Sequence, residues 1–313
     1  MIKIDLITGF LGAGKTTFIK HYARDCISRG ERICILENDF GAVNVDMMLL
    51  QDMIRENCDM EMVAGGCDAD CHRRRFKTKL ISMGMLSYDR VIVEPSGVFD
   101  MDEFFDVLRE EPLDRWYEIG SVIAIVDAGL DEDMSSDEKY VLATEAAHAG
   151  RIVFSHMKDG ESDQAIDILN DCMALIKCDR VIGTDDTIKK DWSKLSPADF
   201  DDIRKSGFFT ADYQKRDVTD GGDFETLYYM DHGQSADEVK ERISRIFSDS
   251  SYGRVIRIKG FAKADAGWVE INAKKDVMTA SPIEKGQEVI IVIGENLDAG
   301  RLDAEFPNSM KSI

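Results

Sequence analysis

Short apolar runs recur along the first two thirds of the chain, and a longer stretch of mixed composition separates each from the next. The first run, Ile2–Thr8, ends at a glycine, and similar runs follow at residues 33–37, 91–94, 122–127 and 152–154. Stretches with helical spacing lie between several of them, at residues 17–28, 101–109 and 138–149. Apolar strands that alternate with helices are typical of a parallel sheet covered on both faces. The pattern therefore predicts an α/β fold with a mostly parallel sheet.

The pattern changes after residue 206. Residues 219–223 contain two glycines among polar residues, which is typical of a linker. Beyond it, strand-like runs occupy residues 224–230, 255–261, 267–273 and 288–293, and residues 236–247 have helical spacing. We therefore expect a small C-terminal α+β domain with a mostly antiparallel sheet. The predicted domains are residues 1–218 and 224–313.

Composition narrows the range of partners. The 313 residues are 44% hydrophobic and include 39 basic and 60 acidic residues, a formal net charge of −21. A chain of this length suits one large domain and a smaller one. An acidic surface repels nucleic-acid backbones and anionic membranes, so we expect neither as a partner.

The cysteines and the first residues bear on the compartment. Seven cysteines are scattered without regular spacing, which favours a reducing environment over a disulfide framework. The first apolar run leads directly into a glycine-rich segment, so no cleavable signal sequence is recognised. No run approaches the roughly 18 apolar residues of a membrane span. We therefore expect a cytoplasmic protein.

Residues 9–16, with the sequence G-F-L-G-A-G-K-T, fit the phosphate-binding P-loop pattern. Glycines let backbone N–H groups turn toward a phosphate, and the positive end of the following helix favours the same anion. Lys15 adds a compact positive charge, and the Thr16 hydroxyl is a hard ligand suited to Mg²⁺. The sequence therefore predicts a P-loop NTPase. The expected nucleotide-binding residues here are Gly9, Gly12, Ala13, Gly14, Lys15, Thr16 and Thr17.

Two acidic residues at strand ends complete the predicted catalytic site with Lys15. Glu94 ends an apolar strand and precedes Pro-Ser-Gly, the place of a Walker-B-type carboxylate that would hold Mg²⁺ together with Thr16. Glu37 ends the preceding predicted strand, where it would position the attacking water or contact a metal. Asp127 ends a later strand and is a second candidate for the metal. The alternative for each acid is an ordinary strand-end carboxylate in solvent.

Six segments, in their order along the chain, resemble those of the CobW-type GTPases, which are relatives of the HypB and UreG nickel-insertion proteins. They are T-G-F-L-G-A-G-K-T-T at 8–17, E-N-D-F-G at 37–41, V-E-P-S-G at 93–97, I-V-D-A at 125–128, R-I-K-G-F at 257–261 and I-G-E-N-L-D at 293–298. The resemblance spans nearly the whole chain. It implies GTP hydrolysis with Mg²⁺ and a function as a metallochaperone or metal-insertion factor. The implied partners are a nucleotide and a client metalloprotein or cofactor enzyme. Whether the protein forms a homo-oligomer is left open by the resemblance.

The metal motif of that family, Gly-Cys-x-Cys-Cys, is altered here. The chain reads G-C-D-A-D-C-H at residues 66–72, so the thiols that remain are those of Cys67 and Cys71, followed by His72. Two thiolates and an imidazole suit Zn²⁺ or another transition metal. The sequence therefore predicts a metal site formed by Cys67, Cys71 and His72 in a loop. A reactive thiol pair and a metal-free loop are the alternatives.

The motif for base recognition also departs from the family. Where the family has Asn-Lys-x-Asp, this chain reads S-H-M-K-D at residues 155–159. The resemblance implies that Ser155 and Asp159 contact the base, although the aspartate comes one position late. The resemblance to the family favours GTP as the nucleotide, and ATP is the alternative.

These observations leave three hypotheses for the function. The first is a GTP-hydrolysing chaperone for a metal or metal cofactor. The second is a nucleotide-gated, partner-binding protein that has lost its metal function, which the two altered motifs favour. A small-molecule kinase is the third, and it is disfavoured because no lid-like arginine cluster is evident beyond residues 73–75.

Overall fold

The computed structural model describes residues 1–39, 50, 53–54, 57–64, 69–97, 99, 101–130, 133–157, 161–216, 224–265, 267–307 and 309–311. The chain divides into two compact units, Met1–Asp220 and Gly221–Ile313. Within the described ranges, every helix is too short or too polar to cross a membrane.

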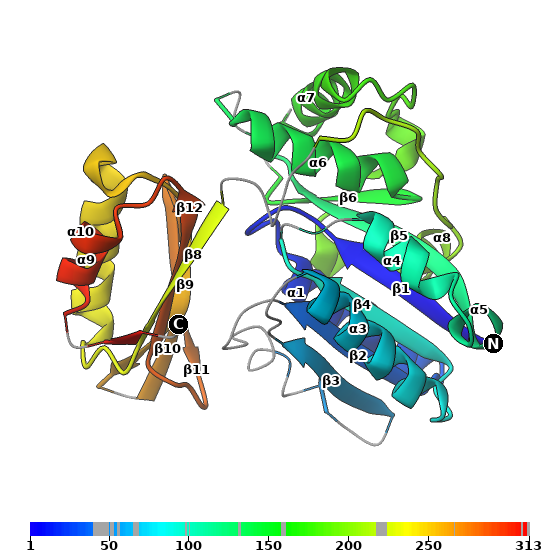
Figure 1. The fold of residues 1–313 in the computed structure, drawn as a ribbon, viewed down its shortest axis with the longest axis horizontal. Helices are drawn as coiled ribbons and strands as arrows, with labels where there is room; N and C mark the ends of the chain where they lie inside the picture. Colours follow the sequence, from blue (N-terminus) through cyan, green and yellow to red (C-terminus); the bar gives the residue numbers. More distant parts are fainter. Residues whose placement is uncertain are drawn as a thin grey trace. The chain divides into compact units, whose positions relative to one another are not determined.

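The larger unit is built on a seven-stranded sheet in which every neighbouring pair is parallel (Figure 1). The strand order is β3-β2-β4-β1-β5-β6-β7. The strands are β1 (Ile2–Thr8), β2 (Ile33–Asp39), β3 (Cys58–Ala64), β4 (Arg90–Pro95), β5 (Tyr117–Asp127), β6 (Arg151–Ser155) and β7 (Thr187–Ile188). The predicted parallel sheet is confirmed.

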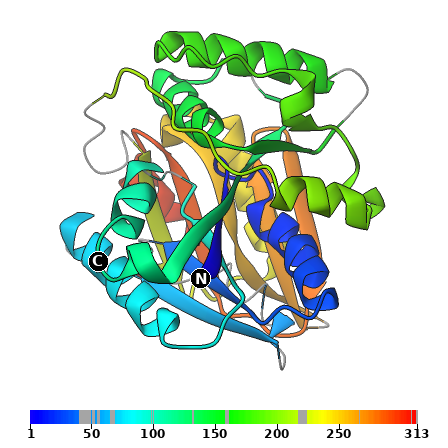
Figure 2. The same cartoon turned by 90° about the vertical axis from the view of Figure 1, so that its right-hand side faces the viewer.

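Helices cover both faces of this sheet. They are α1 (Lys15–Ser28), α3 (Ala69–Gly84), α4 (Met101–Leu108), α5 (Leu113–Trp116), α6 (Ser136–His148), α7 (Glu161–Leu175) and α8 (Pro197–Arg204), with short 3₁₀ turns η2 (Thr184–Asp186) and η3 (Trp192–Lys194). Along β4, Val91 and Val93 join the apolar cluster of α3, α4, α6 and α7, whereas Ile92 joins that of α1 and α8. Successive strand residues point to opposite faces, so an unbroken apolar strand feeds both layers. Figure 2 shows α1 (dark blue) and α3 (cyan) on opposite sides of the strands.

The smaller unit has a six-stranded sheet in which every neighbouring pair is antiparallel, in the order β11-β10-β9-β12-β8-β13. Its strands are β8 (Phe224–Met230), β9 (Arg254–Ala264), β10 (Gly267–Lys274), β11 (Val277–Ile283), β12 (Val289–Glu295) and β13 (Met310–Lys311). Its helices are α9 (Ala236–Ser248), α10 (Ala299–Glu305) and the 3₁₀ turn η5 (Ser250–Tyr252). Val239 and Ile243 of α9 pack with Ile271 and Ile290 of the sheet. The predicted α+β arrangement is confirmed for this unit.

A buried ion pair links the strands β1 and β4 of the larger sheet. Arg90 Nη1 lies 2.5 Å from Asp5 Oδ2, and the two side chains are 7% and 0% exposed. The Tyr22 hydroxyl donates to the same Asp5 oxygen at 2.7 Å, and the Ser121 N–H donates to Oδ1 at 2.9 Å. These three contacts satisfy the carboxylate of Asp5, as a buried charge requires.

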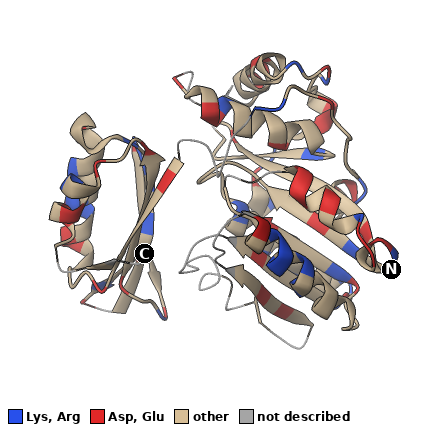
Figure 3. Cartoon of the chain, in the orientation of Figure 1, with Lys and Arg blue, Asp and Glu red and all other residues tan. Residues whose placement is uncertain are grey.

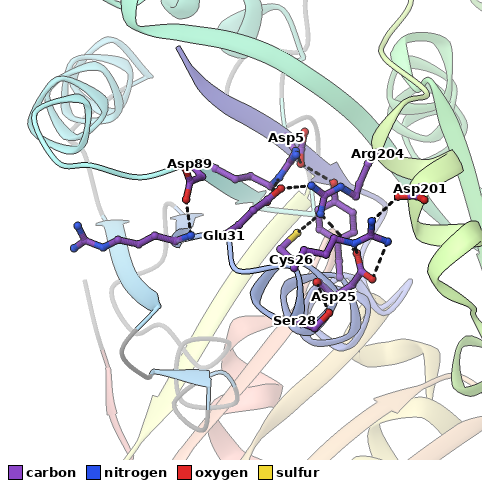
Figure 4. A network of polar contacts seen from close by, with 12 residues as sticks. Asp5, Asp25, Cys26, Ser28, Glu31, Asp89, Asp201 and Arg204 are labelled. Carbon is purple, nitrogen blue, oxygen red and sulfur yellow. Dashed lines mark hydrogen bonds and ion pairs between the residues drawn. The ribbon is translucent and has the colours of Figure 1, made fainter.

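Glu31 extends this pair to helices α1 and α8 (Figure 4). Its carboxylate accepts from Arg90 Nε at 2.9 Å and is ion-paired with Arg204 of α8. Burial alone would raise the pKa of Glu31, but the two guanidinium groups hold it below its ordinary value. Arg204 Nη1 also lies 3.4 Å from Cys26 Sγ, and burial raises the pKa of that thiol to about 12. Cys26 is therefore a structural, unreactive cysteine.

Candidate functional site

Residues 9–14 connect β1 to α1 and have the backbone of a phosphate cradle. Gly9, Gly12 and Gly14 have φ values of 150°, 76° and 101°, which only glycine adopts without strain. A Cβ on Gly9 would also lie 2.3 Å from the carbonyl oxygen of Ile125. Gly14 is the N-cap of α1, so the first N–H groups of that helix point toward the loop. This arrangement suits the binding of a phosphate anion.

The side chains of the loop divide between its interior and its surface. Lys15 is buried and its Nζ donates to the carbonyl oxygen of Gly9 at 2.6 Å, so the ammonium is held across the loop. Ala13 is buried, whereas Thr17 is exposed. The predicted nucleotide-binding residues numbered 9–17 therefore form one continuous segment, and Lys15 supplies its positive charge.

Two buried carboxylates stand side by side next to the start of α1. Glu37 of β2 and Glu94 of β4 are direct neighbours in the strand register, and they are 3% and 4% exposed. The Thr16 hydroxyl donates to Glu94 Oε1 at 2.7 Å. Ligands of open α/β sheets bind at the carboxyl ends of the strands, where these side chains lie. A hydroxyl and carboxylate oxygens form the hard donor set that Mg²⁺ prefers, so the residues present fit that ion.

The segment after Glu94 packs on the phosphate loop. A Cβ added to Gly97 would lie 2.5 Å from Leu11 Cδ2 and 3.1 Å from Leu11 Cα. The preceding Ser96 donates its N–H to the carbonyl oxygen of Asn38 at 2.9 Å. The loop and the ends of β2 and β4 therefore form one packed unit.

The predicted base-recognition segment lies at the end of β6. Ser155 is buried, and His156 has a φ of 49° with Nδ1 at 3.1 Å from Asp127 Oδ2. Asp127 thus contacts His156, and its role as a metal ligand stays a prediction. Asp159 lies outside the described residues.

Trp192, which belongs to none of the sequence motifs, lies between this segment and the phosphate loop. Its Nε1 donates to the carbonyl oxygen of Phe154 at 2.9 Å, and its ring is 5.4 Å from that of Phe18. A Cβ on Gly14 would lie 3.0 Å from Trp192 Cη2 and 3.9 Å from Ser155 Cβ. In the sequence, this tryptophan stands within the polar stretch K-K-D-W-S-K. A large aromatic side chain in such a stretch indicates that the segment packs against another part of the protein.

The predicted zinc ligands are only partly described. Cys67 lies outside the described residues. Cys71 and His72 lie in the first turn of α3, so the prediction of a loop is wrong for these two. His72 is fully buried, and its Nε2 is 2.7 Å from Asn38 Oδ1. Because an amide oxygen accepts, Nε2 of His72 is the donor in this contact.

The described residues do not by themselves form a metal cluster. Within those ranges, no three histidine, cysteine, aspartate or glutamate side chains are grouped so as to hold a metal ion. Cys71 is half-buried beside His72 at the start of α3. The predicted site of Cys67, Cys71 and His72 therefore stays a prediction.

Basic side chains gather on α3, where Figure 3 shows several blue positions on one helix. Arg73 Nη2 lies 2.8 Å from Glu110 Oε1, and Lys77 pairs with the same carboxylate. Lys79 pairs with Glu61 at 2.8 Å. Arg73, Lys77 and Lys79 are thus engaged in ion pairs with acidic residues of the protein.

The geometry defines a P-loop nucleotide-binding protein in which Thr16, Glu37 and Glu94 lie together at the carboxyl edge of the parallel sheet. Residues 3–182 match the family described as CobW/HypB/UreG, nucleotide-binding domain, and the chain belongs to that family.

Several curated proteins are similar in sequence. The chain is 29% identical over 161 residues to the zinc chaperone YjiA of Escherichia coli, covering 49% of each chain. It is 29% identical over 172 residues to the zinc chaperone YeiR of the same organism, covering 53% of this chain and 50% of the relative. The zinc-regulated GTPase metalloprotein activator 1 of Schizosaccharomyces pombe is 21% identical over 184 residues, with 56% and 44% covered. The matched part of this chain thus spans about half the length of these relatives.

A solved structure is also similar along the chain. The Zn(II)-bound YjiA GTPase from E. coli is 20% identical, with 99% of each chain covered and a TM-score of 0.42.

Proposed function

We propose that this protein is a GTP-hydrolysing metallochaperone that carries zinc, with Mg²⁺ as the cofactor of hydrolysis. The names of the relatives, zinc chaperones and a zinc-regulated GTPase, support the proposal at the level of the family. One structural observation carries it further. Glu37, at the candidate hydrolysis site, is followed directly by Asn38, whose Oδ1 binds His72 next to Cys71.

The end of β2 therefore links the phosphate site to the start of α3. On one side, Glu37 neighbours Glu94, which accepts from Thr16. On the other side, Asn38 contacts His72 at 2.7 Å. A change at the γ-phosphate that moves the end of β2 would move the residues next to Cys71. Such a link is what a nucleotide-controlled change in zinc affinity requires.

In the proposed hydrolysis, a water oxygen attacks the γ-phosphorus and the bond to the bridging oxygen of the β-phosphate breaks. Lys15 and the N–H groups of residues 9–16 stabilise the charge that develops on the phosphate oxygens. Glu37 would orient the water. Thr16 and Glu94 would hold Mg²⁺, which when bound neutralises phosphate charge.

The second hypothesis is a nucleotide-gated protein that binds a partner without carrying metal. The burial of His72 and the engagement of its Nε2 by Asn38 favour it. In both hypotheses residues 1–218 bind the nucleotide, residues 224–313 form a second domain, and the partner is a client protein.

The zinc prediction separates these two hypotheses. Replacing both Cys67 and Cys71 by serine is expected to weaken zinc binding by about 10- to 100-fold, because thiolates are its proposed ligands. The affinity of the wild type is expected to differ between its GDP-bound state and its state with a non-hydrolysable GTP analogue. Competition for zinc against a chromophoric chelator measures both effects.

Cys178→Ser is the matched control, since Cys178 is another half-buried free thiol of the larger unit. It should bind zinc as the wild type does. Equal, weak zinc binding by the wild type and the double variant in both nucleotide states would contradict the zinc-chaperone hypothesis. The hypothesis of a nucleotide-gated, partner-binding protein would then stand.

The Mg²⁺ site gives a second prediction. Thr16→Ala and Glu94→Ala are each expected to slow GTP hydrolysis by about 100-fold, because the charge developing at the phosphate is then poorly stabilised. Nucleotide affinity should fall much less. Single-turnover hydrolysis across a range of Mg²⁺ concentrations measures the first effect, and calorimetric titration the second. Glu118→Ala, which removes an exposed acid from β5, is the control. Wild-type turnover in Glu94→Ala would make that residue an ordinary strand-end acid.

A further inference from the structure

Glu145 is a buried carboxylate against the phosphate loop that the proposed hydrolysis does not use. It lies in α6 and is 1% exposed. Its neighbours in that helix, Ala143, Ala146 and Ala147, are fully buried apolar residues. An ionisable side chain in such a place is costly unless specific partners hold it.

The hydrogen-bond partners of Glu145 are Thr8, the last residue of β1, and Gly9, the first residue of the phosphate loop. The Thr8 hydroxyl donates to Glu145 Oε1 at 2.8 Å, and the backbone N–H of Gly9 donates to the same carboxylate. The carbonyl oxygen of Gly9 in turn accepts from Lys15 Nζ at 2.6 Å. Gly9 is also confined on another side, since a Cβ there would lie 2.3 Å from the carbonyl oxygen of Ile125. A single residue, Gly9, thus joins the buried acid to the phosphate-binding lysine.

The ionisation of this carboxyl is finely balanced. Glu145 Oε2 has no hydrogen-bond partner within the described part of the chain. Burial raises the pKa of Glu145 to about 7, although Lys15, the Thr8 hydroxyl and the Gly9 N–H each act to lower it. Lys15 is the charged group that acts on the carboxyl, and Thr8 and Gly9 are uncharged. Both protonation states of Glu145 are therefore populated near neutral pH.

We propose that Glu145 is a positioning residue of the phosphate loop, and that its neutral form accompanies a bound nucleotide phosphate. An ionised carboxylate offsets part of the Lys15 charge and repels the incoming anion. The neutral carboxyl keeps an acceptor oxygen for Thr8 and Gly9 and leaves the Lys15 charge to the phosphate. Nucleotide binding is therefore accompanied by proton uptake. The inference rests on nucleotide binding at this loop, as the proposed function does.

The test compares the wild type with Glu145→Gln, which imitates the neutral carboxyl. A bound phosphate raises the pKa of Glu145 further, so affinity should fall as pH rises above about 7. We expect the Kd of wild type for GDP to increase about tenfold between pH 6.5 and 8.5, and that of Glu145→Gln to change less than about twofold. Titration calorimetry at several pH values, in buffers of different ionisation enthalpy, also counts the protons taken up.

Two further variants make the result decisive. Glu145→Ala removes the acceptor for Thr8 and Gly9, so it should bind GDP more weakly than Glu145→Gln at every pH. Glu118→Gln, which changes an exposed acid, should follow the wild type. Parallel pH profiles for wild type and Glu145→Gln, with no difference in proton uptake, would overturn the inference and leave the proposed function standing. Failure of the wild type to bind GDP would instead remove both.

Discussion

Lys15→Ala is expected to weaken binding of GDP and of a non-hydrolysable GTP analogue by about 10- to 150-fold. The variant loses a charge-assisted hydrogen bond to phosphate, worth about 1.5–3 kcal/mol, and about 1.4 kcal/mol corresponds to a factor of ten in Kd. The effect should be large because Lys15 is held over the loop by its bond to the carbonyl oxygen of Gly9. Isothermal titration calorimetry in the presence of Mg²⁺ measures it.

Lys3→Ala is the control for this experiment, because Lys3 is a partly exposed lysine of β1, the strand that precedes the loop, and is ion-paired with Glu118 at 2.6 Å. It should bind nucleotide as the wild type does. Thermal unfolding of Lys15→Ala separates a loss of affinity from a loss of fold. A folded Lys15→Ala protein with unchanged affinity would remove residues 9–16 as the nucleotide site.

Arg90→Ala is expected to lower the free energy of unfolding of the larger unit by about 3–5 kcal/mol, because it leaves the carboxylate of Asp5 buried without its ion-pair partner. Glu31 loses a donor at the same time. Urea unfolding followed by circular dichroism measures the change.

The matched control is Arg115→Ala. Arg115 is ion-paired with Glu111 on the surface, where the two side chains are 71% and 73% exposed, so its loss should cost about 0–1 kcal/mol. A double variant with Asp5→Asn and Arg90→Met removes both buried charges and should recover part of the stability. Equal stabilities of Arg90→Ala and Arg115→Ala would show that the buried pair contributes no more than a surface pair.

The central strands and the phosphate loop could be predicted because their signals are local. An unbroken apolar run such as that of β4 indicates a strand buried on both faces of the sheet, and the spacing of the glycines indicates the phosphate loop. β3 and β11 were not predicted. β3 carries charged residues at positions 59 and 61 of a sheet edge, and most residues of β11 are exposed. Edge strands need few apolar residues, so they give a weak pattern.

The parts of the site that depend on distant contacts could not be predicted. Thr8 and Glu145 are 137 positions apart, and nothing in either segment indicates their hydrogen bond. A partial signal was present in α6, since the segment V-L-A-T-E-A-A-H has no polar face that would place an acid in solvent. The contact between Asn38 and His72 likewise depends on how α3 packs beside β2. The sequence motifs predict which chemical groups form the site. Tertiary packing decides which other side chains contact those groups and change their ionisation or position.

Trp192 also gives the protein an intrinsic optical probe. Of the three tryptophans, Trp192 is the one in contact with Gly14, whereas Trp116 packs near Gly84 and Trp268 belongs to the smaller unit. With phenylalanine at positions 116 and 268, indole emission would come from a single fluorophore beside Gly14 of the phosphate loop. Association and release of unmodified nucleotides could then be followed in real time by stopped-flow fluorescence, without attaching a dye to either partner.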